Sequence, residues 1–478
     1  MMAVARPVSA PVAATILRRH TDLWLSLAMG GLVGLLIFTL PMQAALSTAV
    51  VGAFVLIMLV DTRVALLALL LVRATVDVFA TVPVLSAGGG INPNALMSLL
   101  VIALGIAHIA INRIDVRRIP LVTPFTIFVG MTFLTLAIAP DFLQGLEDWL
   151  RILSALLIYV MVVDLMRQER ERRWLLRIIV LSAIVPLCFG LYQFATNTGD
   201  HATPGFNRVL ATFVHPSPYA FFLVQILPLA LLLFTHARSR VARLALGVMV
   251  PVMLFSIYAT QTRGAWIGVL VMVAVLMWYR MRWALLLIPL FLAAAYVGVP
   301  SVRARVSEAT SGTCQSTTYC ESSVLWRTKQ WERAVRIPSP PELVTVGAGL
   351  RAVVVTVDEY SHNEYLRLLA ETGLIGLTLT LVLYRDLFLI TSRGYRDAHT
   401  PFKRDLMLAF MMVFLSRVVM SGADNLLVIT VLEWYFWAFA AVVVVESGAY
   451  DRFAHIQDNR RALRQREPDS AVPGAAPA

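Results

Sequence analysis

Long apolar stretches recur along the chain, and short polar segments separate them. Each stretch is near twenty residues, the length of helix that crosses about 30 Å of hydrocarbon. A helix satisfies its own backbone hydrogen bonds, so these stretches predict transmembrane helices. We predict about fourteen spans (12–14), at residues 23–40, 44–60, 62–80, 95–112, 121–138, 149–165, 176–196, 217–235, 244–261, 264–280, 283–299, 372–391, 405–421 and 426–445.

The composition agrees with this pattern. Of the 478 residues, 59% are hydrophobic and 14% are charged, whereas ordinary soluble domains have about 25% charged residues. The mean hydropathy is +0.75. We therefore expect an all-α fold, a polytopic integral membrane helical bundle with no large soluble domain.

The net charge of +11 is explained more simply by membrane topology than by a nucleic-acid partner. Basic residues gather in alternate loops, such as 113–118, 167–177 and 385–404, whereas the short loops between them contain acids such as Asp141 and Glu147. This is the positive-inside pattern, and it predicts that both termini are cytoplasmic. We expect no nucleic acid among the partners.

These spans and charges predict the order of the segments. We expect a cytoplasmic N-terminus (1–22), transmembrane helices 1–11 (23–299), an extracytoplasmic catalytic loop with short helices (300–371), transmembrane helices 12–14 (372–445) and a cytoplasmic tail (446–478). The first span is expected to remain as an anchor, because the topology requires it. The tail is polar, then small and proline-rich, so we predict that it is disordered.

The long outside loop is the exception to the charge pattern, because it contains many arginines. One interpretation is a solvated loop, since long loops cross membranes despite their charge. Residues 323–337 can instead form an amphipathic helix, with Lys329 and Arg333 on a polar face and Trp331 and Val335 on an apolar face. Arg327 falls on the apolar side. It would either pair with a phosphate or carboxylate there, or extend along the surface into water.

The three cysteines suggest structure and not catalysis. Cys314 and Cys320 lie in the long outside loop, on the oxidising side of the membrane, where a local disulfide is expected. Cys188 lies inside a span, and we interpret it as a small buried apolar residue. No Cys/His cluster has metal-ligand spacing.

The loop ends with SHNEYLRLLAETGLIG, in which Ser361 and Glu364 have the spacing of a capping box. This spacing predicts a helix with His362 at its first position. The positive end of a helix dipole disfavours an imidazolium, so His362 would be neutral and able to accept a proton. The alternative is a histidine packed under the loop on the same helical face as Tyr365.

At this point the sequence resembles the O-antigen ligase and polymerase superfamily. The histidine-asparagine pair is followed by ETGLIG, which matches a Glu-x-Gly-Leu-x-Gly turn into a span. Further elements follow the family order: RVLATFVHPSPYAFFL, TQTRGAWIG, a Trp-Arg helix, VGAGL and ADNLLVITVLEWYFW. The resemblance covers roughly residues 60–445, and it departs from the family at HPSPYA, where proline is more often followed by asparagine.

The resemblance implies a membrane glycosyltransferase, which would take its glycan from a polyprenyl diphosphate carrier. The acceptor would be a hydroxyl of a glycolipid or a polysaccharide, or in some members of a protein. The enzyme would lie in the bacterial plasma (inner) membrane among membrane lipids, with its active site on the extracytoplasmic face. We expect no cofactor.

The candidate catalytic residues follow from this chemistry. A diphosphate leaving group needs fixed positive charge, which Arg208, Arg263 and Arg327 would supply. Arg208 and Arg263 are the basic residues well inside the short outside loops, although each could instead form a structural ion pair. His362 matches the family histidine and would be the general base that takes the acceptor proton.

Further residues are expected to line the site. His215 is the weaker candidate for the base, and we interpret it as a turn residue in front of a proline. Asn363 follows the histidine, Glu371 would orient His362 or cap its helix, and Arg151 would contact substrate or lipid phosphate. No acidic pair has a spacing that demands a divalent cation, so we predict metal-independent transfer.

Other intramembrane charges are expected to be scaffolding. Arg73 and Asp77 lie one helical turn apart, and Arg417 and Glu433 lie on consecutive spans.

Two questions of function stay open. A ligase and a polymerase differ in their acceptor, which the sequence does not identify. A transporter or flippase of lipid-linked glycan is the alternative class, and it predicts polar residues facing one another across many spans. Few such residues occur in this chain.

Overall fold

The computed structural model describes residues 61–79, 93–201, 207–310, 323–338 and 342–466. Within these ranges every named element is a helix, and β-pairing is limited to an isolated bridge between Asp200 and Arg208. The first two predicted spans, Cys314 and Cys320 lie outside the described residues.

The first helices match the predicted spans from residue 62 onward. They are α3 (Thr62–Val76), η1 (Asp77–Phe79), α4 (Pro93–Ile111), η2 (Val116–Arg118), α5 (Val122–Leu134), η3 (Thr135–Ile138), α6 (Phe142–Leu165), α7 (Glu169–Leu181) and α8 (Ile184–Thr196).

The next group contains apolar helices and then the short helices of the long loop. These are α9 (Pro216–Thr235), α10 (Arg240–Ala259), α11 (Arg263–Arg280), η4 (Arg282–Leu286), α12 (Leu287–Gly298), α13 (Pro300–Thr310), α14 (Ser323–Arg336), α15 (Glu342–Val346) and α16 (Ala352–Val357). The last four helices are α17 (Glu364–Arg396), α18 (Pro401–Ser421), α19 (Thr430–Glu446) and α20 (Ala449–Arg466).

The membrane character of the chain is visible in its helices, but the predicted number of spans is not confirmed. By length and composition, five helices in the described residues could each cross a membrane, or up to seven if each of two bent pairs counts as one span. The five are Glu169–Thr196, Pro216–Thr235, Arg240–Ala259, Arg263–Arg280 and Glu364–Arg396. An all-helical chain with several such helices fits a multi-pass membrane protein.

The core of the bundle is built around α19, which is buried along most of its length. Its aromatic side chains pack against α18 and α5: Phe436 contacts Phe410 with ring centres 5.6 Å apart, and Trp437 contacts Phe125 at 4.5 Å. Offset aromatic contacts of this kind add to the packing of a bundle that has no hydrophobic driving force between its helices.

Both predicted scaffold ion pairs are present. Arg73 donates to Asp77 at 3.0 Å within one helical turn, and Arg417 on α18 pairs with Glu433 on α19. All four side chains are largely buried. A buried charge without a partner is strongly destabilising, so each pair requires its two helical positions to stay together.

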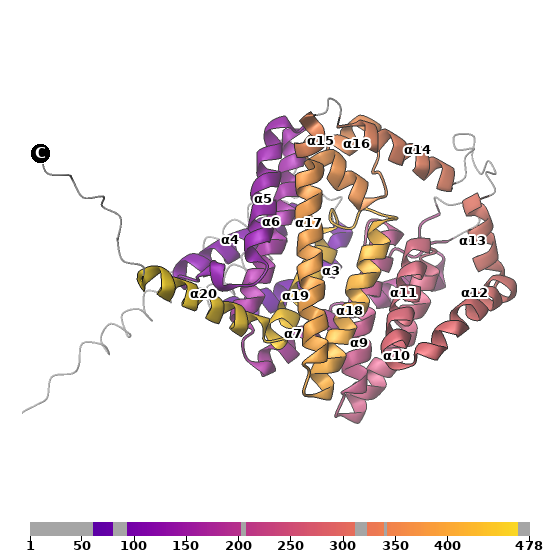
Figure 1. Cartoon of the computed structure of the whole chain (residues 1–478). Coiled ribbons are helices and arrows are strands. Elements are labelled where there is room, and N and C mark those ends of the chain that lie inside the picture. Colours follow the sequence, from indigo (N-terminus) through magenta and orange to yellow (C-terminus); the bar gives the residue numbers. More distant parts are fainter. Residues whose placement is uncertain (1–60, 80–92, 202–206, 311–322, 339–341, 467–478) are drawn as a thin grey trace, which may run out of the picture.

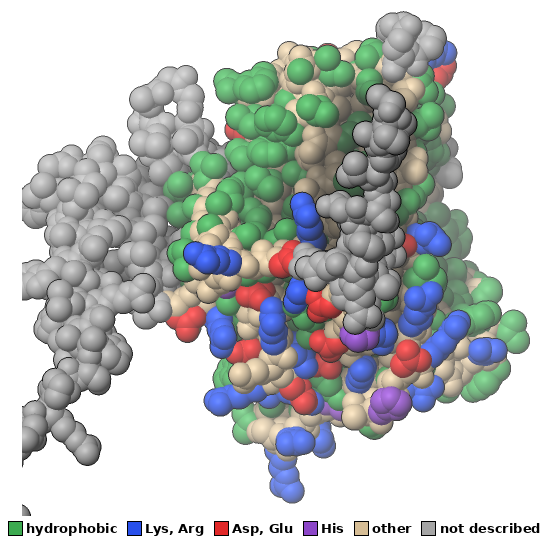
Figure 2. Space-filling view, turned by 60° about the vertical axis from the view of Figure 1, so that its left-hand side comes forward, with side chains coloured by type: hydrophobic (Ala, Val, Ile, Leu, Met, Phe, Trp, Pro, Cys, Tyr) green, Lys and Arg blue, Asp and Glu red, His purple; other side chains and the backbone are tan. Residues whose placement is uncertain are grey.

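Short helices cover one end of the bundle. We call it the pocket end, because the pocket described below lies there. Figure 1 shows α14, α15 and α16 lying across the top of the long helices. The turn between α9 and α10 and the turn between α17 and α18 lie at the opposite end. Figure 2 shows hydrophobic side chains over the upper part of one face and charged side chains gathered toward the opposite end.

Much of the tail differs from the prediction. We expected disorder from residue 446, but Ala449–Arg466 forms the helix α20, which projects sideways from the bundle in Figure 1. Arg118 donates to Asp458 of α20 at 2.5 Å. A contact with a distant loop therefore supports a helix whose own composition has little apolar surface to bury.

A glycine bends α17 where the loop enters the bundle. Gly373 has φ 64° and ψ −169°, a conformation that is not helical and that is essentially restricted to glycine. A side-chain carbon at this position would lie 2.3 Å from the carbonyl oxygen of Thr345 on α15. The bend thus holds α15 tightly against the start of α17.

We expect Gly373→Ala to destabilise the protein, because strained backbone alone costs about 1–3 kcal/mol and the new carbon collides with α15. The measurement is thermal unfolding of the purified protein in detergent. Gly130→Ala is the matched control, since nothing lies within 4 Å of a side-chain carbon at Gly130 on α5. Equal unfolding temperatures for the two variants would contradict this account of the bend.

Candidate active site

A pocket at the pocket end brings together five residues that the sequence analysis singled out: Arg208, Arg263, Arg327, His215 and His362. They come from four separate parts of the chain, namely the segment before α9, the start of α11, α14 and the segment before α17. The other lining residues are Ser217, Gln261, Thr262, Gly264, Arg305, Ala423 and Asp424. The lining thus has four arginines and one carboxylate, which makes it an electropositive site.

Backbone carbonyls hold the arginine side chains in place. The Nε of Arg208 donates to the carbonyl of Thr260 at 3.0 Å, and the Nε of Arg305 donates to the carbonyl of Gln261 at 3.1 Å. Arg263 donates to the carbonyl of Arg305 at 3.2 Å. The turn between α10 and α11 is therefore the common support for these cations.

Arg327 reaches the same pocket from α14. Its Nη1 donates to the carbonyl of Ala423 at 3.0 Å. The expected polar face is right, since Lys329 and Arg333 are exposed. The expected apolar face is wrong in part: Val335 is exposed, and Arg327 lies on the covered side of the helix with Gln330 and Ala334. Contacts of α14 with α16, with α17 and with the loop after α18 determine which of its sides is covered, and hydrophobicity alone does not.

His362 lies before the helix and not inside it. We expected it at the first helical position, but α17 begins at Glu364, and the backbone of His362 is left-handed with φ 49°. Asn363 is the residue that caps the helix, because its side-chain oxygen accepts from the N–H groups of Tyr365 and Leu366 at 3.1 and 3.2 Å. An asparagine is a strong N-cap, and it displaces the predicted capping box.

The left-handed backbone at His362 has a counterpart across the pocket. Gln261, which also lines it, has φ 52°. Residues other than glycine rarely adopt such a backbone conformation. Where residues are held in this conformation, they are often found at functional sites. Both residues hold groups that face the pocket, namely the imidazole of His362 and the carbonyl that anchors Arg305.

Asp424 is the hydrogen-bond partner of His362, and the sequence did not predict this contact. Its Oδ1 lies 3.1 Å from Nδ1 of His362, and the ring of Trp326 packs edge-on against the imidazole at 5.5 Å. Asp424 belongs to the ADNLL motif, which we noted without assigning its residues. The available signal was an acid directly after a predicted span, in a loop that the charge pattern predicts on the outer side.

The carboxylate of Asp424 is held in its ionised form. Burial raises the pKa of Asp424, but hydrogen bonds from His362 and the backbone of Asn425, together with the charge of Arg327, lower it further than burial raises it. The net pKa is below that of an ordinary aspartate. An ionised Asp424 accepts a hydrogen bond and so favours the tautomer of His362 that has its proton on Nδ1.

His215 caps α9 at the edge of the pocket. Its Nδ1 accepts from the N–H of Ser217 at 3.2 Å, which requires an unprotonated nitrogen. The residue is exposed. Desolvation by the pocket walls lowers the pKa of His215, and the charge of Arg208 lowers it further, while Asp424 acts in the opposite direction. The net pKa of His215 is therefore below that of an ordinary histidine.

Three predicted site residues are not in the pocket lining. Besides Asn363, these are Glu371 and Arg151. Glu371 is buried and accepts from Arg367 at 2.7 Å, and the carboxylate that contacts His362 is that of Asp424. Arg151 pairs with Asp148 on its own helix. Both residues therefore form ion pairs outside the pocket.

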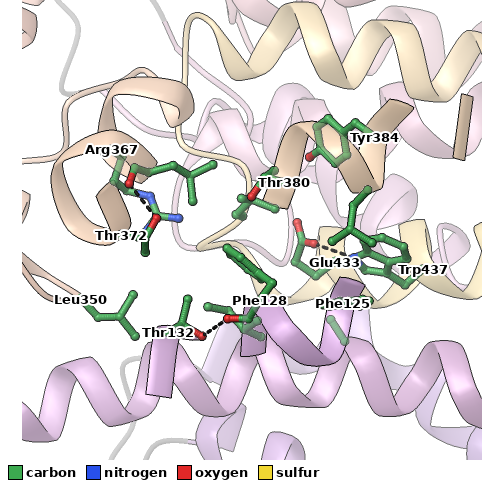
Figure 3. Close-up of a pocket in the computed structure, with 15 residues that line it drawn as sticks. Phe125, Phe128, Thr132, Leu350, Arg367, Thr372, Thr380, Tyr384, Glu433 and Trp437 are labelled. Atoms are coloured by element: carbon green, nitrogen blue, oxygen red, sulfur yellow. Dashed lines mark hydrogen bonds between the residues drawn. The ribbon is translucent and has the colours of Figure 1, made fainter. Parts of the chain in front are cut away.

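A second cavity lies inside the bundle between α5, α6, α17 and α19 (Figure 3). Thr132, Thr380 and Glu433 line it among aromatic and aliphatic side chains, and Glu433 accepts from Trp437 at 3.2 Å. None of the predicted site residues lines this cavity. Among the described residues, no group of three His, Cys, Asp or Glu side chains is arranged to hold a metal ion.

The fold and the pocket define a class of protein: a multi-pass helical membrane protein with an arginine- and histidine-lined pocket at one end. The model of the O-antigen ligase family matches residues 248–381. This match confirms the predicted resemblance to O-antigen ligases over that part of the chain. The matched segment supplies Arg263, Arg305, Arg327 and His362, whereas Arg208, His215 and Asp424 lie outside it. No curated protein matches the chain.

We expect His215 to make stability depend on pH. Because its folded-state pKa is lowered, the unfolded chain binds a proton first as the pH falls below about 6.5. Stability should therefore decrease as the pH falls from that value toward the folded pKa. His215→Asn keeps a capping oxygen but cannot titrate, so it should reduce the loss of unfolding temperature between pH 7.5 and 5.5.

The matched control for this measurement is His399→Asn, at an exposed turn residue of the opposite end. It should leave the pH dependence of the unfolding temperature as in the wild type. A pH dependence that is identical in His215→Asn and the wild type would contradict the assignment.

Proposed function

We propose that this chain is an integral-membrane glycosyltransferase that moves a glycan from a polyprenyl diphosphate to an acceptor hydroxyl. The supporting observation is the convergence of Arg208, Arg263, Arg305 and Arg327 with His362 and Asp424 on one pocket. The O-antigen ligase family match indicates glycan transfer of this general kind. The donor and the roles of the individual residues are our inference.

The arginines suit a diphosphate leaving group. A guanidinium offers several N–H donors in a fixed plane, stays charged at all relevant pH values and binds phosphate oxygens in pairs. Arg208 and Arg305 are buried and anchored to carbonyls, so their orientation is set before the substrate arrives. Preorganised charge of this kind stabilises the negative charge that develops as the diphosphate departs.

The transfer step needs a base for the acceptor. Nε2 of His362 takes the hydroxyl proton while the acceptor oxygen forms a bond to the anomeric carbon. The bond between that carbon and the phosphate oxygen breaks, and its electron pair leaves with the polyprenyl diphosphate. A general base contributes about 10²–10⁴-fold to the rate of such a step.

Asp424 orients this base. The 3.1 Å contact with Nδ1 leaves Nε2 as the nitrogen with the lone pair, and the carboxylate stabilises the imidazolium that forms after proton transfer. The arrangement has the same logic as other base-carboxylate pairs, in which the carboxylate sets tautomer and orientation. Asp424 is a positioning residue, because it acts through His362.

The location of the pocket also suits a lipid-linked donor. It lies where helices α9, α11 and α17 begin and where α10 and α18 end, so a diphosphate at this end would leave its polyprenyl chain in the membrane beside the bundle. The positive-inside pattern assigns the pocket end to the extracytoplasmic side. The acceptor would approach from that side.

The test is an assay with purified protein in lipid, polyprenyl-diphosphate oligosaccharide as donor, and candidate glycolipid or polysaccharide acceptors. A ladder of products indicates a polymerase, and a single added chain indicates a ligase. Binding of the donor without any transfer would favour the flippase alternative.

We expect His362→Ala to lower kcat by about 10²–10⁴-fold with little change in KM for the donor. Asp424→Asn should lower kcat less and move the pH profile, because the amide no longer fixes the tautomer of His362. A higher kcat in Asp424→Glu than in Asp424→Asn would show that the loss in Asp424→Asn comes from the positioning of His362 and not from a general loss of folding. Unchanged kcat in His362→Ala would overturn the assigned base.

The role of the pocket arginines in binding the diphosphate can be tested with a matched pair of variants on one helix. Arg305 lines the pocket, whereas Arg303, two residues earlier on α13, is exposed and does not. Arg305→Ala should reduce kcat/KM by about 10²-fold, with Arg305→Lys in between, and Arg303→Ala should be near wild type. Equal losses in the two alanine variants would refute a diphosphate clamp at Arg305.

A further inference from the structure

A long apolar groove lies on the side of the bundle, away from the pocket. One wall comes from α7 and α8, with Leu181, Ile184 and Leu187, and the other comes from α10, with Leu246, Met249 and Val252. The groove has a volume of about 970 Å³, at the upper end of the range for ligand sites, about 300–1,000 Å³. Cys188, which we expected to be buried, is exposed and lines this groove.

The groove has two different ends. Toward the pocket end, α8 and α10 meet, and the rings of Phe194 and Phe255 pack edge-on at 4.9 Å. At the opposite end lie the start of α7 and the turn between α9 and α10, which contribute Arg173, Arg177 and Arg238 to the lining. The shape is an apolar channel with cations at one end.

The three arginines differ in how they are held. Arg173 pairs with Glu169 at 2.6 Å and lies over the ring of Phe402 at 4.0 Å. Arg177 lies over the ring of Trp174 at 5.2 Å. Within the described residues, neither Arg177 nor Arg238 forms an ion pair, and both are exposed. Three arginines against one glutamate leave this end of the groove positive.

We propose that this groove binds one anionic glycerophospholipid, with its phosphate at Arg177 and Arg238 and an acyl chain between α8 and α10. The ligand must combine a long apolar part with a negative group at one end, and a phospholipid has this form. Basic pockets between transmembrane helices recognise anionic headgroups in this way. Trp174 is placed as an interfacial aromatic would be.

Charge favours this occupant over a second copy of the chain. A packed helix would cover the leucines of both walls, but it would also need carboxylates opposite two exposed arginines. A lipid phosphate in the water-accessible headgroup layer satisfies them without that requirement. The arginines of the groove lie at the opposite end of the bundle from His362. The proposal therefore does not depend on the proposed transferase activity.

The test is native mass spectrometry of the full chain in detergent, titrated with phosphatidylglycerol or with phosphatidylcholine of the same acyl chains. The wild type should retain one phosphatidylglycerol with an affinity about tenfold or more above that for phosphatidylcholine. Arg177→Gln/Arg238→Gln should remove this preference. Arg393→Gln/Arg396→Gln, with the same charge change on exposed residues of α17, should keep it.

A steric variant tests the apolar channel separately. Ala245 lines the groove, and Ala245→Trp should reduce retention of both lipids, whereas Val241→Trp, at an exposed position outside the lining, should not. Cys188 provides a second measurement in the wild type, because bound phosphatidylglycerol should slow its alkylation by a maleimide.

Three results would overturn the proposal. These are equal retention of the two lipids by the wild type, an unchanged preference in Arg177→Gln/Arg238→Gln, and a dimeric mass with no lipid and a protected Cys188. The last result would assign the groove to a second copy of the chain.

Discussion

The cost of burying charge in a low-dielectric bundle governs this structure. An arginine within a membrane protein needs an anionic or polar partner, because the lipid supplies none. In the interior, Arg73 meets Asp77, Arg417 meets Glu433, and Arg367 meets Glu371. At the pocket end, by contrast, four arginines face one cavity with one lining carboxylate. The first arrangement holds helices together, and the second gathers positive charge where an anionic substrate can use it.

The pocket depends on turns more than on helices. Arg208 and Arg305 are anchored by the turn between α10 and α11, and His362 and Asp424 lie just before α17 and just after α18. The helices fix where these turns begin and end. The bend at Gly373 matters for the same reason, since it sets the start of α17 against α15 while the rest of the helix runs through the bundle. Sites on rigid supports retain the geometry that catalysis requires.

The two ends of the molecule have different chemistry. The pocket end combines arginines with histidines and a carboxylate, which suits proton transfer beside a phosphate. The opposite end presents arginines beside an apolar groove between α8 and α10, which suits a lipid. A lipid there would fill the space between two helices that meet near Phe194 and Phe255. It would therefore affect how firmly α10 is held, and α10 leads directly into the turn that supports the pocket.

The sequence by itself determined the elements that depend on local pattern. Apolar length predicted long apolar helices such as α9, α11 and α18, and motif order predicted that Arg208, Arg263, Arg327, His215 and His362 belong together. Tertiary structure decided the partners. It gave His362 the carboxylate of Asp424 and gave Arg305 the carbonyl of Gln261. The physical reason is that periodicity and capping act over a few residues, whereas an ion pair or a hydrogen bond forms between groups that only the packing of distant helices brings within 3 Å or so.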